Sequence, residues 1–334
     1  MGSLELTIKI VITLFMGWYL ISNLIALRKA QMSDPAQFKS AERALKANKL
    51  AVARADLDRF IKDNGRRAYA FAAVIGFCAR TRRMDLLAYY APRAELETRM
   101  ESEADRATVY ESLAAAYLSM GNMDKPIAQS AVRAAREAMR LAPESTVAMN
   151  SLAYTLAETS TDPKTLVEAR DLVVSALRIV NSQAGDVDRQ LNLAMDEDTY
   201  GWALYKLGRY GPPKDAPANF SRAVDVITQS LNDMPEAVPE QERKDIYYHL
   251  GAAYRRIGRG EEARNALQTA LHYEPENEAA RRELQELAVS HSPQSSAPPP
   301  GDGSASMKTL VAPRQPTAFT PLDVRVAPKD GAAR

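Results

Sequence analysis

The chain has 334 residues, enough for two ordinary domains or for one long array of repeats. Lys and Arg together number 43 and Asp and Glu 42, so the net charge of +1 lacks the basic excess of a typical nucleic-acid-binding protein. The single cysteine, Cys78, excludes an internal disulfide framework and leaves too few thiols for a zinc site. Because Cys78 lies in the apolar stretch AFAAVIGFCA, we expect it to be a buried core residue.

The first feature along the chain is an uncharged apolar run at 10–27, IVITLFMGWYLISNLIAL. As a helix this run would be about 27 Å long, enough to cross the hydrocarbon core of a bilayer. Lys9 precedes it and Arg28 and Lys29 follow it, so basic side chains flank both ends. The run is longer than the apolar part of a secretory signal peptide, and no small-residue cleavage site follows it. The sequence therefore predicts an uncleaved membrane anchor and linker over 1–33.

The orientation of this anchor is predicted from the basic residues around it. Arg28, Lys29, Lys39, Arg43 and Lys46 follow the span, whereas only one lysine and the terminal amine precede it. The positive-inside rule then places the rest of the chain on the cytoplasmic side, as in a single-pass protein of the bacterial inner membrane. A periplasmic placement stays open, because folded domains can be translocated regardless of charge.

The body of the chain, residues 34–290, predicts one helix after another. Turn residues recur at short intervals, and alternating runs of β-branched residues are almost absent. The clearest pattern lies in DIYYHLGAAYRRIGRGEEARNALQTALHYEP, at 245–275. Its spaced apolar and small residues are Tyr247, Leu250, Gly251, Tyr254, Ala263, Leu267, Ala270 and Pro275.

This segment resembles the tetratricopeptide repeat, whose pattern is W-x2-L-G-x2-Y followed by A-x3-F and a closing proline. The resemblance implies an all-α fold, a right-handed α-solenoid in which antiparallel helix pairs of about a dozen residues per helix stack on one another. Small residues would let neighbouring backbones approach closely. We expect Gly251 on the first helix to face Ala263 on the second, with Ala270 receiving the next helix.

Three looser copies of the pattern precede the clear one, so we predict a repeat array over 107–290 that ends in a capping helix after Pro275. Residues 34–106 predict divergent helical hairpins. The apolar stretch around Cys78 is too short to cross a bilayer and predicts a buried helix. The predicted repeat-packing residues are Leu113, Ala114, Tyr117, Ala131, Ala138, Pro143, Leu152, Ala153, Ala169, Gly201, Ala223, Pro235, Leu250, Gly251, Tyr254, Ala263, Ala270 and Pro275.

The last segment, residues 291–334, is rich in proline and predicts a disordered tail. Its sequence VAPR at 311–314 returns as VAPK at 326–329. Apolar and basic residues spaced in this way are compatible with a docking segment that orders on binding, and equally with a spacer of chance composition.

No catalytic constellation emerges from the sequence. The histidines are His249, His272 and His291, and none has a spacing that suits a metal site. We expect His249 to be a groove or surface residue, and the acidic triplet DED at 196–198 to lie at a helix N-terminus, where it favours the helix dipole. The sequence therefore predicts no enzyme, no cofactor and no small-molecule substrate.

The resemblance also implies a binding surface, since the first helices of the pairs form an inner wall that often holds a peptide. Aromatic side chains on this wall would anchor a partner, and Lys206, Arg255 and Arg256 would pair with an acidic one. Whether Trp202 and Tyr205 instead pack against the neighbouring repeat stays open. The predicted groove residues are Glu111, Asn150, Tyr154, Asp198, Trp202, Tyr205, Lys206, Tyr248, Arg255 and Arg256.

Taken together, anchor, repeat array and tail predict a non-enzymatic, membrane-anchored scaffold that binds partner proteins in the groove of its repeats. The alternative is an accessory or chaperone-like subunit of an envelope or secretion assembly, whose groove a single partner fills permanently. A repeat fold indicates a mode of binding and does not identify the ligand.

Overall fold

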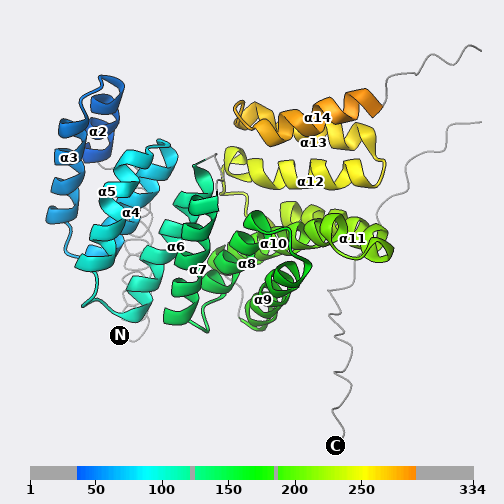
Figure 1. Ribbon diagram of the computed structural model, residues 1–334, viewed down its shortest axis with the longest axis horizontal. Helices are drawn as coiled ribbons and strands as arrows, with labels where there is room; N and C mark the ends of the chain where they lie inside the picture. Colours follow the sequence, from blue (N-terminus) through cyan, green and yellow to red (C-terminus); the bar gives the residue numbers. More distant parts are fainter. Residues whose placement is uncertain (1–35, 121–124, 184–186, 291–334) are drawn as a thin grey trace, which may run out of the picture. The chain divides into compact units, whose positions relative to one another are not determined.

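The computed structural model describes residues 36–120, 125–183 and 187–290 (Figure 1). All regular structure in these ranges is helical, as the sequence predicts. The helices are α2 (Ala36–Lys46), α3 (Leu50–Asp63), α4 (Arg67–Arg80), α5 (Met84–Glu97), α6 (Glu103–Ser119), α7 (Lys125–Leu141), α8 (Thr146–Thr159), α9 (Pro163–Ser182), α10 (Val187–Tyr210), η1 (Pro213–Asp215), α11 (Ala216–Asp233), η2 (Glu240–Arg243), α12 (Lys244–Arg256), α13 (Gly260–Tyr273) and α14 (Glu278–Ser290).

The predicted anchor at 10–27 and the predicted tail at 291–334 lie outside the described residues. Among the helices that are described, none combines the length and the apolar character that crossing a membrane requires.

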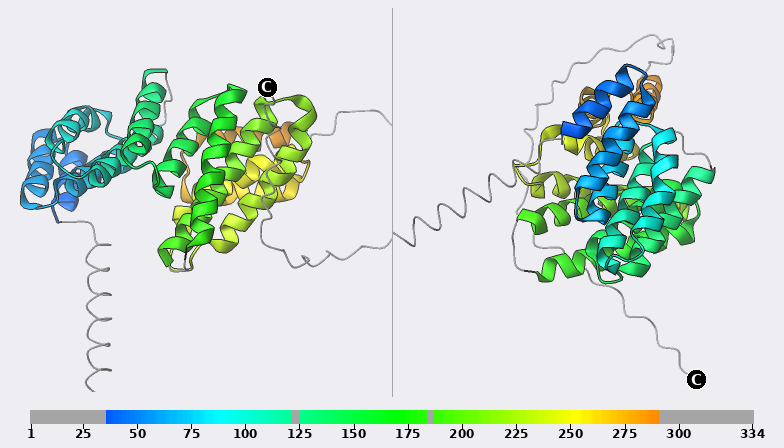
Figure 2. Two further views of the ribbon diagram at one scale, coloured as in Figure 1. Left: turned by 90° about the horizontal axis from the view of Figure 1, so that it is seen from below. Right: turned by 90° about the vertical axis from the view of Figure 1, so that its left-hand side faces the viewer.

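Consecutive helices pack as hairpins, and the hairpins follow one another along the chain (Figures 1 and 2). The paired helices are α2 with α3, α4 with α5, α6 with α7, α8 with α9, α10 with α11, and α12 with α13. From α4 onward, the first helix of each hairpin also contacts the first helix of the next, and α12 contacts α14 in the same way. Contacts between neighbouring hairpins of this kind are what a repeat array uses to build a continuous core.

Three of the hairpins share one turn geometry. Asn48, Arg82 and Gly258 each follow the first helix and adopt the left-handed conformation, with φ of 55°, 51° and 76°. In each turn the next N–H donates to a carbonyl five residues earlier, at N···O distances of 2.8 to 3.0 Å, which closes the C-terminus of the helix. The N-terminal hairpins therefore use the same turn as the hairpin with the clear repeat pattern.

Glycines mark the positions where paired helices approach most closely. A Cβ on Gly201 of α10 would lie 2.3 Å from Cγ1 of Ile227 on α11, and one on Gly251 would lie 2.6 Å from Cγ of Leu267. The small residues are thus needed for backbone approach, as the sequence predicts. The expected partner of Gly251 was wrong, because the helices are offset by one turn, so that Leu267 rather than Ala263 fills the space opposite the glycine.

Most predicted packing positions are buried. These are Leu113, Ala114, Ala131, Ala138, Leu152, Ala153, Ala169, Gly201, Ala223, Pro235, Leu250, Gly251, Ala263 and Ala270. Tyr117 and Tyr254 are half-buried, whereas Pro143 and Pro275 are exposed in the turns after α7 and α13. These two prolines stop a helix and do not pack, because proline cannot continue the hydrogen-bond ladder.

The hairpins before residue 107 contribute an aromatic group to the continuous core of the array. The ring of Phe38 on α2 lies 4.7 Å from that of Phe60 on α3 and 5.2 Å from that of Phe77 on α4. Cys78, beside them on α4, is fully buried, as predicted, and burial raises the pKa of its thiol to about 12. The thiol therefore stays protonated and packs as a small apolar group.

Candidate functional site

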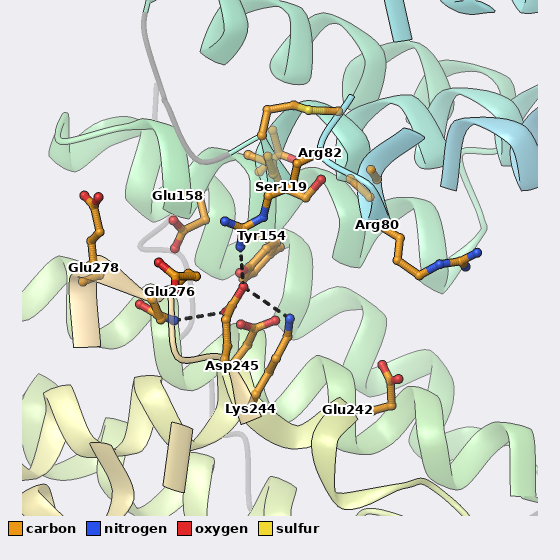
Figure 3. Close-up of a pocket in the computed structure, with 18 of the residues that line it drawn as sticks. Arg80, Arg82, Ser119, Tyr154, Glu158, Glu242, Lys244, Asp245, Glu276 and Glu278 are labelled. Atoms are coloured by element: carbon orange, nitrogen blue, oxygen red, sulfur yellow. Dashed lines mark hydrogen bonds and ion pairs between the residues drawn. The ribbon is translucent and has the colours of Figure 1, made fainter. Parts of the chain in front are cut away.

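A cavity of about 1260 Å³ lies on the side of the hairpins where first helices contact one another (Figure 3). One wall consists of the C-terminal part of α4, the turn at Arg82, and α6 and α8. The opposite wall consists of η2, the start of α12, and the turn that leads from α13 into α14. The cavity is thus formed by segments that are far apart in the sequence, and it is large enough for several side chains of a partner.

Charged side chains make up about half of the lining, and acidic ones outnumber basic ones. The acidic residues are Glu158, Glu242, Asp245, Glu274, Glu276 and Glu278, and the basic residues are Arg80, Arg82, Lys244 and Arg282. The cavity therefore carries a negative formal charge.

Glu274 links the two walls, because it pairs with Arg82 of one wall and Lys244 of the other; dashed lines in Figure 3 mark these pairs. Its Oε1 lies 2.7 Å from Nη2 of Arg82 and 3.5 Å from Nζ of Lys244, and its Oε2 accepts a hydrogen bond of 3.3 Å from the amide of Asn277. Two of the four basic side chains are consequently occupied by a single carboxylate. The remaining acidic side chains dominate the interior.

The aromatic ring of Tyr154 lies in the wall of the cavity, with Glu158 one turn later on the same helix. Burial raises the pKa of the Tyr154 hydroxyl well above its ordinary value, and the nearby charges of Glu158 and Asp245 raise it further. Asp245 reaches the same space from the first turn of α12 and is open to the cavity. Protein surrounds it closely enough that lost hydration raises the pKa of its carboxyl as well.

Of the predicted groove residues, only Tyr154 lines the cavity. Asp198, Trp202 and Tyr205 are buried, with 3%, 3% and 1% of their surface exposed, and do not offer a surface to a partner. Trp202 stacks on the ring of Tyr205 at 4.6 Å and on that of His249 at 4.1 Å. Trp202 therefore packs against the neighbouring hairpin, as the alternative expects, whereas Tyr205 packs against Trp202 and against Phe220 of its own hairpin.

His249 is also buried, so its expected place in the groove or on the surface was wrong. Its Nδ1 lies 2.9 Å from Oδ1 of Asp198, which joins α12 to α10. Burial by itself lowers the pKa of His249, but the Asp198 carboxylate outweighs it and holds the pKa above its ordinary value. Trp202 covers this pair and donates its indole N–H to Glu158, so the buried cluster supports a carboxylate of the cavity wall.

The basic side chains predicted to meet an acidic partner are placed elsewhere. Arg255 pairs with Glu283 and, at 2.8 Å, with Glu286, both on α14. Lys206 is half-buried with its ammonium 5.4 Å from the centre of the Trp202 ring. Arg256 is exposed, with its guanidinium 6.0 Å from the ring of Phe220. The described structure therefore forms no basic groove from these three residues.

Glu111, Asn150 and Tyr248, the other predicted groove residues, are half-buried and do not line the cavity. The residues that sequence reasoning missed are the acidic ones, above all Glu158 and Asp245. Glu158 follows Tyr154 by one helical turn, which was a usable signal. Nothing in the sequence indicates that α12 returns to face α8.

The acidic triplet at 196–198 lies in the middle of α10, a helix of 24 residues, and not at an N-terminus as expected. Burial raises the pKa of Asp196 to about 8 and that of Glu197 to about 9. Within the described ranges, no group of three acidic, histidine or cysteine side chains is arranged to hold a metal ion.

Comparisons with known proteins leave the family open. No family model matches the chain, and no curated protein matches it. Among solved structures, BtubC (BKLC) from P. vanneervenii is similar, with 17% identity over 81% of this chain and 100% of its own, at a TM-score of 0.41. A tetratricopeptide repeat protein from Parabacteroides merdae shares 12% identity over 75% of this chain and 97% of its own, at a TM-score of 0.39.

A third similar structure is the APC/C hetero-tetramer Cut9-Hcn1, with 14% identity over 79% of this chain and 53% of that one, at a TM-score of 0.33. Because the TM-scores and identities are low, these similarities support no conclusion about the family or function of this chain. The helical hairpins and the acidic cavity are observed in the described residues of this chain and do not depend on the comparisons.

Proposed function

We propose that the chain is a non-enzymatic scaffold that holds a segment of a partner protein in the acidic cavity. The observation that carries this proposal is the cavity itself, which is formed by five separate segments and lined by exposed polar side chains. Helix pairs that leave a large concave surface between them are suited to enclosing an extended segment.

A lining of charged side chains favours a partner that exchanges over one that stays permanently. Obligate interfaces resemble a protein core and are more apolar than transient ones. The cavity wall is instead rich in carboxylates and guanidinium groups. This favours the scaffold over an accessory subunit whose groove is always filled.

Membrane attachment is the second part of the proposal. It rests on the uncharged apolar run at 10–27 and its basic flanks, which also favour a cytoplasmic position for the helices. We expect the whole chain to stay in the membrane pellet after a carbonate wash and a chain without residues 1–29 to be released. Retention of the shortened chain would contradict the anchor.

Site-specific photo-crosslinking tests the cavity as a binding site. A photoreactive amino acid at Ala115 or at Ala279, both in the cavity lining, is expected to give an adduct with the same partner protein in the native host. The matched control position is Asp225, which is exposed on α11 and does not line the cavity. An adduct of equal yield at Asp225, or none at the two cavity positions, would reject the cavity as the binding site.

A further inference from the structure

The cavity wall contains a place suited to a single cationic group. Tyr154 lies there with Glu158 and Asp245 close by, close enough that both carboxylates act on the Tyr154 hydroxyl (Figure 3). One oxygen of Glu158 accepts the indole N–H of Trp202, which fixes this carboxylate in position. Lysine and arginine head groups bind favourably against an aromatic face that has carboxylates beside it.

The cations already present do not fill this place. Arg82 and Lys244 are both held by Glu274. Arg282 is exposed on α14. Within the described residues, Glu242, Asp245 and Glu278 take part in no ion pair, although the charges of Lys244 and His249 act on Asp245 from a greater distance.

Carboxylates that are enclosed but unpaired are costly, since they lose hydration without gaining a partner. Asp245 shows this cost, because the loss of hydration raises the pKa of its carboxyl. A bound cation would restore the lost interaction, and its attraction is strengthened in a cavity where the effective dielectric constant is lower than in water.

We infer that the segment held in the cavity is positively charged and that one of its lysine or arginine side chains lies against Tyr154 between Glu158 and Asp245. This rests on the proposed function and specifies the chemistry of the partner. It also reverses the acidic partner expected from Lys206, Arg255 and Arg256, since none of these residues lines the cavity.

The test uses the whole chain in detergent micelles and a fluorescein-labelled Gly-Ser peptide that carries several arginines. Fluorescence anisotropy is expected to show binding that weakens steeply with added salt, and no binding of the same peptide with glutamates in place of the arginines. Equal binding of the two peptides would overturn the inference.

Paired substitutions locate the contact. Glu158→Gln with Asp245→Asn is expected to weaken binding of the arginine peptide on the order of tenfold or more, since two charge-assisted contacts are lost. The matched control is Glu144→Gln with Asp225→Asn, which removes the same charge from exposed positions outside the cavity. Equal weakening in both double variants would show a general charge effect and overturn the inference.

Tyr154 is tested separately. Tyr154→Phe keeps the aromatic face and is expected to bind nearly as well as the wild type, whereas Tyr154→Leu is expected to bind several-fold more weakly. A purely structural role would make the two variants differ in thermal stability and not in affinity, and such a result would contradict the cation site.

If the double variant of Glu158 and Asp245 fails to fold, the double variant Glu242→Gln with Glu278→Gln tests the inference in its place. Both side chains are exposed to the cavity and outside its helical core, so folding is expected to be unaffected. Weaker arginine-peptide binding supports the inference, and unchanged binding contradicts it. The crosslinks from Ala115 and Ala279 do not depend on charge, so a neutral or acidic crosslinked segment would reject the cationic partner while leaving the scaffold proposal intact.

Discussion

At the scale of single residues, three consecutive acidic side chains of α10 meet three different surroundings. Asp198 has a counter-ion in His249 at 2.9 Å. Glu197 shares a hydrogen bond with Asp233, a second carboxyl, and this raises its pKa beyond the effect of burial. Asp196 is 2% exposed, and its Oδ2 has no hydrogen-bond partner among the described residues. Because helix positions differ in what they face, neighbouring carboxyls acquire opposite effects on stability.

The first prediction concerns the buried pair of Asp198 and His249. Because the folded state raises the pKa of His249, the pair stabilises the fold fully below the unfolded pKa of about 6.5 and loses this contribution as the pH rises through the folded pKa. Asp198→Asn is expected to lower the free energy of unfolding by about 3 kcal/mol at about pH 6. Urea denaturation of both proteins should show a smaller difference at about pH 9. A difference that grows with pH would contradict the assignment.

The second prediction concerns Asp196, whose pKa burial raises to about 8. A carboxyl with a raised pKa in the folded state costs stability progressively as the pH rises from its unfolded pKa toward the folded one. Asp196→Asn removes this cost and is expected to stabilise the protein by on the order of 1 kcal/mol at about pH 8, with no gain at about pH 4. Thermal unfolding at the two pH values measures it, with the exposed Asp225→Asn as control. A gain of the same size for Asp225→Asn would point to net charge instead.

At the scale of elements, the sequence predicts the helices well and the contacts between them only in part. The hairpins, the buried small residues and the apolar helix around Cys78 all follow from helical periodicity and composition. The offset that places Leu267 against Gly251 cannot be predicted from periodicity, because sliding one helix by one turn leaves the periodicity of both helices unchanged. The length of α10 was missed for a related reason, since its buried acidic triplet reads as polar and suggests a helix start.

The third prediction contrasts two helical glycines. Gly201→Ala places a Cβ 2.3 Å from Cγ1 of Ile227 and is expected to cost about 1–3 kcal/mol. At Gly76 of α4 an added Cβ meets nothing within 4 Å, so Gly76→Ala is expected to stabilise by about 0.5–1 kcal/mol. Chemical denaturation of the two variants measures the opposite signs.

A double-mutant cycle assigns the Gly201 effect to its neighbour. Ile227→Ala removes the atoms that clash, so Gly201→Ala should cost less in that background, with a coupling of about 1 kcal/mol. Additive effects of the two substitutions would place the strain elsewhere.

At the scale of the whole described chain, the cavity depends on contacts that no local pattern contains. Arg82, in the turn after α4, pairs with Glu274, in the turn after α13. Glu158 of α8 and Asp245 of α12 likewise both act on the hydroxyl of Tyr154. Of the groove residues predicted from helix periodicity, only Tyr154 therefore lines the cavity, because periodicity assigns a face to a helix but not the distant helix that covers it.

Arg82 is informative in another way, because it holds a left-handed conformation that glycine adopts without cost. Gly258 occupies the equivalent place in the turn after α12, whereas at Arg82 the backbone strain costs about 1 kcal/mol. Of the two non-glycine residues in this conformation, Asn48 and Arg82, it is Arg82 whose side chain reaches Glu274. We interpret Arg82 as a residue retained for this contact, and the fourth prediction tests it.

The fourth prediction is that Arg82→Ala loosens the contact between the α4–α5 turn and the α13–α14 turn. Nitroxide spin labels on cysteines introduced at Ala88 of α5 and Gln268 of α13, both exposed, report the distance between these hairpins in the whole chain. The buried Cys78, whose pKa is raised to about 12, does not compete for the label. A broader and longer distance distribution is expected for Arg82→Ala than for the wild type.

Salt and a matched variant separate this contact from general charge effects. The Arg82 side chain is 51% exposed, so about 1 M salt should broaden the wild-type distribution toward that of Arg82→Ala. Arg136→Ala serves as control, since it breaks a pair of 2.9 Å with Glu168 between α7 and α9, where the packed hairpins α6–α7 and α8–α9 already hold the chain together. Identical distributions in wild type and Arg82→Ala would show that helix packing alone sets the width of the cavity, and the strain at Arg82 would then need another cause.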